Sequence, residues 1–98
     1  MDVSTGGIMS GVSIPVKPNY QVPFSEQVKA KADIPVTAVG LITKPKQAAK
    51  ILAHGEADAV EIGRAALRDP YWPLRAANKL GIPSTEIPYA PQYVAGAY

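Results

Sequence analysis

Two apolar segments of the sequence each end in a glycine, and the second glycine is followed by an arginine. The segments are residues 36–40 and 59–63, so the three residues are Gly40, Gly63 and Arg64. A glycine lets a ligand approach the backbone closely, and a helix starting after residue 63 would present N–H groups that favour an anion. The guanidinium group of Arg64 is planar and always charged, which suits it to phosphate. Glycines ending two consecutive strands match the phosphate site of (β/α)8 barrels, after the seventh and eighth strands.

These three residues also have an ordinary structural explanation. Glycine at a strand end commonly makes a turn, and an arginine beside it is commonly solvated. Either feature alone favours the turn, whereas their occurrence on successive strands supports the turn and the phosphate site equally. The hydroxyl-glycine stretch over residues 4–7, with Ser4, Thr5 and Gly6, is a third candidate for contacting a cofactor, although alone it favours a simple turn.

The other polar residues offer little catalytic chemistry. His54 is the only histidine and falls in the expected last turn of a helix, where a cation is mildly favoured. Without cysteine or a second histidine there is neither a metal-ligand set nor a triad, so we expect no metal site and no catalytic residue here. Glu61 interrupts an apolar strand. It either points into a barrel interior toward a basic group from another strand or lies on an exposed strand face.

The elements that must position these residues alternate between strand and helix. Asp2 and Val3 are expected to end a strand, and a long irregular loop follows as far as residue 23. The sequence predicts helices over residues 24–32, 43–55 and 69–80, strands over 36–40 and 59–63, a helical turn over 63–67 and an irregular tail over 82–98. Such alternation is typical of parallel βαβ units and an α/β architecture. Parallel strands are buried on both faces, so we expect a piece of a larger domain.

Helical periodicity predicts which side chains face the core. The first helix should bury Phe24, Val28 and Ala32, which recur every fourth position. The second should bury Ala48, Ile51 and Leu52. The last should start with Asp69 as N-cap and Pro70 at the first helical position, and should bury Trp72, Ala76 and Leu80 or close neighbours of these.

The composition is that of an ordinary folded protein. Of its 98 residues 47% are hydrophobic and 18% are charged, and the formal net charge is +2. No apolar run approaches the roughly 18 residues that a membrane helix needs, and no signal peptide follows Met1. The lack of cysteine excludes disulfides and fits a cytoplasmic protein. The basic residues are dispersed, so we expect neither nucleic acid nor a membrane as partner.

Five sequence blocks, taken in order, resemble one known family. They are Asp2-Val3-Ser4-Thr5-Gly6-Gly7, Asn19-Tyr20-Gln21-Val22-Pro23-Phe24, Ala38-Val39-Gly40-Leu41-Ile42, Gly63-Arg64 with Leu67-Arg68-Asp69-Pro70-Tyr71-Trp72-Pro73 after it, and Pro91-Gln92-Tyr93. Together they resemble the C-terminal part of the Old Yellow Enzyme family, specifically its YqjM-like FMN-dependent NADPH dehydrogenases. The resemblance covers essentially the whole chain, and the fourth block is its most specific part.

The resemblance implies a fold, a cofactor and a reaction. Residues 1–98 would form the C-terminal segment of a single FMN-binding TIM (β/α)8 barrel, from the end of strand six through strand eight, with the earlier strands missing. Members of the family bind FMN non-covalently, take hydride from NADPH and reduce activated alkenes, acting as ene-reductases. Carried onto this sequence, the flavin-contacting residues are Ser4, Thr5, Gly6, Gly40, Gly63 and Arg64.

The sequence also departs from the family pattern. The tyrosine that protonates the substrate, the histidine or His-Asn pair that binds its carbonyl, and a flavin-tuning cysteine come from earlier strands in the family. An arginine that reaches a neighbouring subunit's site is replaced here by Ala95. We expect a homo-oligomer acting on a small-molecule alkene as the parent enzyme, with the chain alone inactive. The alternative is a non-catalytic truncated fragment that self-associates and retains at most weak phosphate or FMN binding.

Overall fold

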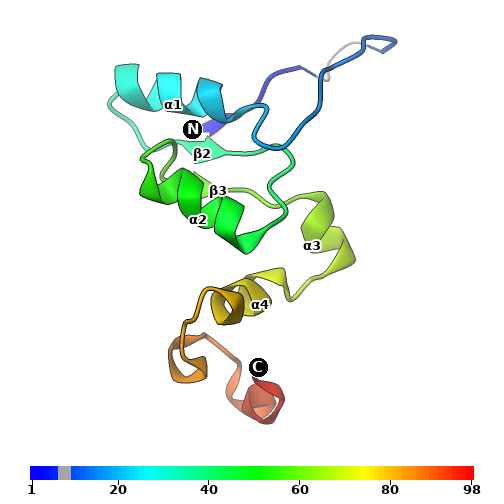
Figure 1. Ribbon diagram of the computed structural model, residues 1–98, viewed down its shortest axis with the longest axis vertical. Coiled ribbons are helices and arrows are strands. Elements are labelled where there is room, and N and C mark those ends of the chain that lie inside the picture. The colour runs from blue at the N-terminus through cyan, green and yellow to red at the C-terminus, as the bar shows by residue number, and fades with distance from the viewer. Residues whose placement is uncertain (7–9) are drawn as a thin grey trace.

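The computed structural model describes residues 1–6 and 10–98, and within them strands and helices alternate as far as residue 68 (Figure 1). The order is β1 (Asp2–Val3), α1 (Val22–Lys31), β2 (Thr37–Ala38), α2 (Pro45–Ala53), β3 (Ala59–Val60), α3 (Arg64–Arg68) and α4 (Trp72–Lys79). Two 3-10 helices, Ser84–Glu86 and Pro91–Gly96, follow in the tail, where the sequence showed no periodicity. The predicted α/β order is confirmed. The loop after β1 lies partly outside the described residues, because it includes positions 7–9.

The three strands form a parallel sheet in the order β1-β2-β3. Asp2 pairs with Thr37, which pairs in turn with Ala59. The strands are shorter than predicted, since each regular strand covers two residues. After β2 the chain turns away at Gly40 and Leu41, whose φ angles of +118° and +49° are incompatible with a continuing strand.

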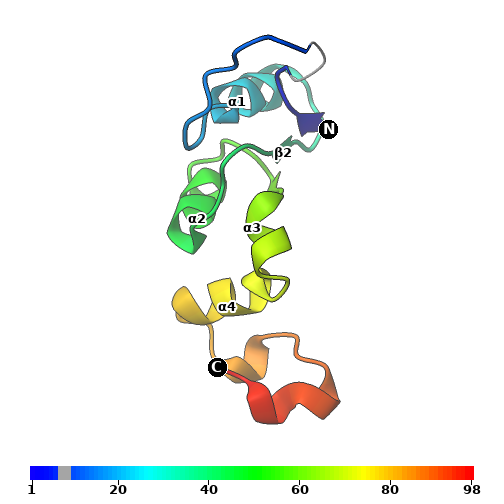
Figure 2. The same cartoon turned by 90° about the vertical axis from the view of Figure 1, so that its right-hand side faces the viewer.

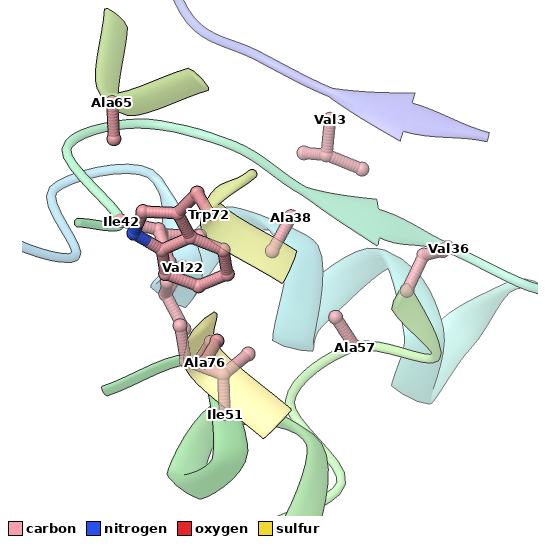
Figure 3. Packing of buried hydrophobic residues seen from close by; sticks show 11 residues of the cluster. Val3, Val22, Val36, Ala38, Ile42, Ile51, Ala57, Ala65, Trp72 and Ala76 are labelled. Atoms are coloured by element: carbon pink, nitrogen blue, oxygen red, sulfur yellow. The ribbon is translucent and has the colours of Figure 1, made fainter. Parts of the chain in front are cut away.

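Both long helices of the βαβ units lie on the same side of the sheet (Figure 2). Helix α1 packs against β1 and β2, and α2 packs against β3. Because side chains alternate along a strand, Val3 and Ala38 face these helices and are buried, whereas Asp2 and Ala59 face the opposite way and are exposed. The buried cluster in Figure 3 consists of Val3, Val22, Val36, Ala38, Ile42, Ala48, Ile51, Ala57, Ala65, Trp72 and Ala76.

The predicted buried face of the first helix is wrong in part. Phe24 is 45% exposed, and the residues that α1 buries fully are Val22 and Ser25. The helix begins two residues earlier than predicted, at Val22, and the face toward the sheet carries Val22, Ser25 and the partly buried Val28. The Ser25 hydroxyl lies 3.1 Å from the carbonyl oxygen of Glu56, so this small polar residue ties α1 to the loop after α2.

The predicted start of the last helix is also wrong. Asp69 is the C-terminal cap of α3, and α4 begins three residues later, at Trp72. The Asp69 carboxylate accepts a hydrogen bond from the backbone N–H of Tyr71 and pairs with Arg75, so it bridges the two helices. Trp72 and Ala76 are buried as predicted, whereas Leu80 is 43% exposed. Leu52 of α2 is likewise exposed.

The chain is more extended than a self-contained domain of its length. Its radius of gyration is 15.5 Å, compared with about 13 Å for a compact domain of about 100 residues. Helix α4 and the tail extend away from the sheet (Figures 1 and 2). Among the described residues, none of the helices has the length and apolar character needed to cross a membrane.

Candidate functional site

A pocket of about 300 Å³ opens where the chain leaves β2 and β3. Its walls come from three segments that are distant in sequence. These are the loop before α1 (Val16, Tyr20, Gln21), the loop after β2 (Val39, Gly40, Leu41, Ile42, Thr43), and the segment after β3 (Glu61, Gly63, Arg64, Ala65, Arg68). The structure therefore brings Gly40, Gly63 and Arg64 together. The carboxyl ends of parallel strands meet at one edge of a sheet, which is why residues some twenty positions apart converge.

The hydroxyl-glycine stretch lies beside this pocket without lining it. Ser4, Thr5 and Gly6 follow β1 directly, and none of them is among the lining residues. Thr5 reaches the site through a buried side chain, because its backbone N–H and its hydroxyl both bond to the Gln21 amide oxygen. Gly7 lies outside the described residues.

Glycine is required by the structure at position 40 but not at position 63. A Cβ at Gly40 would lie 2.7 Å from both Tyr20 Cε1 and Gln21 Nε2, and the φ of +118° disfavours any other residue. Packing and backbone therefore require glycine there. At Gly63 the φ is −89°, and an added Cβ meets no atom within 4 Å in the described part of the chain. The described structure leaves open space at this glycine, on the wall of the pocket.

Two glutamines that the sequence analysis did not single out hold the loops of the pocket. Gln21 is 4% exposed, and its amide nitrogen donates to the carbonyl oxygen of Val39 at 3.0 Å. Gln47, on α2, donates to the Leu41 carbonyl oxygen at 2.9 Å and to Asn19 Oδ1 at 2.6 Å. A sequence signal existed for Gln47, since it stands at the third position of a helix that begins at Pro45, where a glutamine can bond back to the cap.

The charged groups of the pocket differ in their partners. The ion pairs found within residues 1–6 and 10–98 are Lys29–Asp58, His54–Glu56 and Arg75–Asp69, so neither Arg64 nor Arg68 takes part in one. Both arginines are exposed and line the wall formed after β3. An exposed guanidinium without a carboxylate partner is available to an incoming anion.

Glu61 shares the rim of the pocket and lies close to Asp2 on the uncovered face of the sheet. Reduced solvation raises the pKa of Glu61, and a hydrogen bond to the Asp2 carboxyl raises it further. Glu61 is exposed in the described structure on the same sheet face as Asp2, so the choice between a barrel interior and an exposed strand face stays a prediction. The group beside Glu61 is acidic rather than basic.

His54 and Ala95 lie away from this pocket. His54 caps the C-terminus of α2, is exposed, and stands 3.5 Å from Glu56 Oε1. Ala95 lines a separate cavity of about 590 Å³, together with Tyr71, which precedes α4, and tyrosines of the tail such as Tyr93 and Tyr98.

The family model and the individual relatives that match this chain agree on one family of oxidoreductases. The NADH:flavin oxidoreductase / NADH oxidase family matches residues 8–82. The chain is 50% identical over 82 residues to an NADPH dehydrogenase of Geobacillus thermodenitrificans, covering 84% of this chain and 24% of that protein. It is 47% identical over 96 residues to an NADPH dehydrogenase of Geobacillus sp., covering 98% of this chain and 27% of that protein. An NADPH dehydrogenase of Listeria innocua is 48% identical over 81 residues, or 83% of this chain and 24% of its own length.

The chain thus spans about a quarter of the length of the curated relatives it matches. The resemblance to the Old Yellow Enzyme family is confirmed by the family match and by this level of identity. The chain belongs to the NADH:flavin oxidoreductase / NADH oxidase family.

Proposed function

We propose that this chain binds the phosphate of FMN as part of an NADPH-dependent ene-reductase. The observation that carries the proposal is the pocket in which Gly40, Gly63 and Arg64 meet from separate loops. Membership of a flavin oxidoreductase family, with relatives named NADPH dehydrogenase, supports FMN as the ligand of this pocket.

The residues of the pocket suit a phosphate monoester. Arg64 would form charge-assisted hydrogen bonds to the phosphate oxygens, and Arg68 adds a second positive charge on the same wall. The open space at Gly63 lets the phosphate approach the backbone, where the first N–H groups of α3 have no intrahelical acceptor. Ser4, Thr5 and Gly6 would lie at the flavin from the end of β1, next to the Gln21 side chain.

We further propose that residues 1–98 form the C-terminal segment of a TIM barrel, from the end of strand six to strand eight. Strands in sequential order with both α1 and α2 on one side are typical of a singly wound sheet, which closes into a barrel. A doubly wound sheet would place helices on both faces. The uncovered face, with Asp2, Thr37 and Ala59, would then line the barrel interior.

Bound FMN would supply hydride transfer from NADPH to an activated alkene. The residues of this chain would bind and orient the phosphate end, whereas no residue of the chain is assigned to proton transfer. Homo-oligomer formation, with the tail and its tyrosines at the subunit contact, is part of the same proposal.

The test of phosphate recognition is a comparison of FMN with riboflavin, which lacks the phosphate. Charge-assisted bonds contribute about 1.5–3 kcal/mol each, so FMN should bind roughly ten- to hundredfold more tightly. Equal dissociation constants would contradict the proposal. For the activity, a chimera in which this chain replaces the matching quarter of the Geobacillus thermodenitrificans NADPH dehydrogenase should retain FMN and oxidise NADPH with an alkene acceptor. A folded chimera without flavin would also count against it.

The second candidate is a non-catalytic chain that self-associates and retains at most weak phosphate binding. The extended shape and the exposed Leu67 and Tyr93, 85% and 68% accessible, favour it. Sedimentation velocity over a range of concentrations distinguishes the two. Assembly of the chain with itself, with FMN and riboflavin bound equally weakly, would support the second candidate.

A further inference from the structure

Two glutamine side chains donate hydrogen bonds to the backbone carbonyl oxygens of the residues on either side of Gly40. Gln21 Nε2 donates to the Val39 oxygen at 3.0 Å, and Gln47 Nε2 donates to the Leu41 oxygen at 2.9 Å. The two donors come from opposite directions in sequence, one from the residue that caps α1 and the other from the first turn of α2. Alternate carbonyls of one short loop are thus fixed by side chains from its neighbours.

Fixing these carbonyls also fixes the N–H groups of the same peptide units. The peptide bonds are trans, so the N–H of Gly40 points opposite to the Val39 carbonyl, and the N–H of Ile42 points opposite to the Leu41 carbonyl. Gly40 and Ile42 both line the pocket. In the part of the chain that the structure describes, neither N–H donates to a backbone carbonyl.

We propose that Gln21 and Gln47 are positioning residues that turn the N–H groups of Gly40 and Ile42 toward a bound oxyanion. The inference rests on the proposed function in taking that oxyanion to be the phosphate of FMN. The positive φ angles at Gly40 and Leu41 bend the chain sharply here, and successive N–H groups of a turn can form a concavity that binds an anion. A bulky residue such as Leu41 adopts such a φ only where its surroundings impose it.

The glutamines also connect this loop to the other walls of the pocket. The Gln21 amide oxygen holds Thr5 after β1, and Gln47 holds Asn19 in the loop before α1. The amide of each glutamine therefore acts as donor on one side and acceptor on the other, since Gln47 Oε1 accepts from the Thr43 N–H at 3.0 Å. A side chain needed only to fill space would not require both functions.

The first experiment uses the unmodified chain, labelled with ¹⁵N at glycine and isoleucine and titrated with inorganic phosphate. The amide resonances of Gly40 and Ile42 should move together and saturate with one dissociation constant, whereas that of Gly55, in the turn after α2, should stay in place. Movement without FMN binding would overturn the proposed function and leave this inference standing. Tighter binding of FMN than riboflavin with both resonances unmoved would overturn the inference alone.

The second experiment separates positioning from a purely structural role. Gln21→Met and Gln47→Met remove the donors without adding charge, and each should weaken phosphate and FMN about tenfold, as expected for one lost charge-assisted bond. In Gln47→Met, whose side chain does not hold Thr5, riboflavin affinity should change less than twofold. Gln27→Met, at an exposed glutamine of the same helix α1, is the matched control and should change neither ligand. Equal losses for FMN and riboflavin in both variants would overturn the positioning role. Should Gln21→Met not fold, Gln47→Met and the titration above decide the question.

Discussion

The indole N–H of Trp72 donates a hydrogen bond to the backbone oxygen of Thr43, 3.1 Å away. This bond joins the first residue of α4 to the loop that forms one wall of the pocket. Trp72 is also 8% exposed and belongs to the buried cluster. One side chain therefore couples α4 to the loop before α2.

We expect Trp72→Phe to keep the fold and lower the free energy of unfolding by about 1 kcal/mol, the usual cost of a lost hydrogen bond. Trp72→Ala should cost about 3–5 kcal/mol because it also leaves a cavity. Chemical denaturation measures both. Tyr71→Phe, at a neighbouring aromatic that is 67% exposed, is the control and should change stability by less than about 0.5 kcal/mol. A Trp72→Phe variant as stable as the original would show that the bond contributes nothing.

Arg64→Ala should weaken FMN far more than riboflavin. The arginine is exposed on the pocket wall and forms no ion pair with a described residue, so its loss removes a contact to phosphate without breaking an internal one. The loss for FMN should be roughly ten- to hundredfold. Arg64→Lys should recover only part of it, because an ammonium cannot reproduce a bidentate fork. Parallel losses for the two flavins, measured by fluorescence quenching, would make Arg64 a structural residue.

Substituting the two glycines should separate fold from binding. Gly40→Ala introduces a Cβ 2.7 Å from Tyr20 and Gln21 at a φ of +118°, so it should lower the melting temperature by several degrees. Gly63→Ala meets no atom within 4 Å among the described residues, so it should leave stability nearly unchanged. Because the alanine methyl would project toward the phosphate, FMN affinity should nevertheless fall. Calorimetry and FMN titration on the same two proteins check this, and a strongly destabilised Gly63→Ala protein would refute it.

Because the pKa of Glu61 is raised, we expect the free energy of unfolding to depend on pH. Reduced solvation, and then Asp2, raise its pKa above the ordinary 4.5, so the folded chain favours the protonated acid. That contribution is fully present below about pH 4.5 and is lost as the pH rises through the raised value. Glu61→Gln should abolish this decline in the midpoint of urea unfolding. An unchanged profile would show that neither reduced solvation nor Asp2 raises the pKa of Glu61 in solution.

Asp58 serves as the control, because its pKa is shifted in the opposite direction. The backbone N–H of Val36, 2.9 Å away, and then Lys29 lower its pKa below the ordinary 3.8. Its contribution is therefore present above that value and is lost as the pH falls. Asp58→Asn should flatten the acid side of the profile and leave the Glu61 decline intact.

The sequence contained enough information for the order of elements and for the meeting of Gly40, Gly63 and Arg64. Both follow from local rules, because strand ends of βαβ units share one edge of the sheet. That these residues bind phosphate stays a prediction. The start of α4 could not be predicted from the local sequence, because Asp69-Pro70 has the residue types of a helix start. Here these residues follow α3 directly, and the Asp69 carboxylate forms an ion pair with Arg75.

The role of Gln21, and the contact of Gln47 with Asn19, could not be predicted from the sequence for a different reason. Gln21 bonds to Thr5 and Val39, 16 and 18 positions away, and Gln47 bonds to Asn19, 28 positions away. Such bonds exist only once β1, β2 and the two helices are packed. Exposure of Phe24 has a similar origin, because the sheet accepts the Val22 and Ser25 face of α1 instead.

The register of the sheet has a consequence for the order in which the chain folds. Pairing Thr37 with Ala59 closes a loop of 59 − 37 = 22 positions, whereas pairing Asp2 with Thr37 closes one of 37 − 2 = 35 positions. The longer closure costs about 0.4 kcal/mol more in chain entropy. This difference favours pairing of β2 with β3 before β1 joins them. In that order the Thr5–Gln21 contact forms last, and the amides of β1 should be the first in the sheet to exchange their hydrogens with solvent.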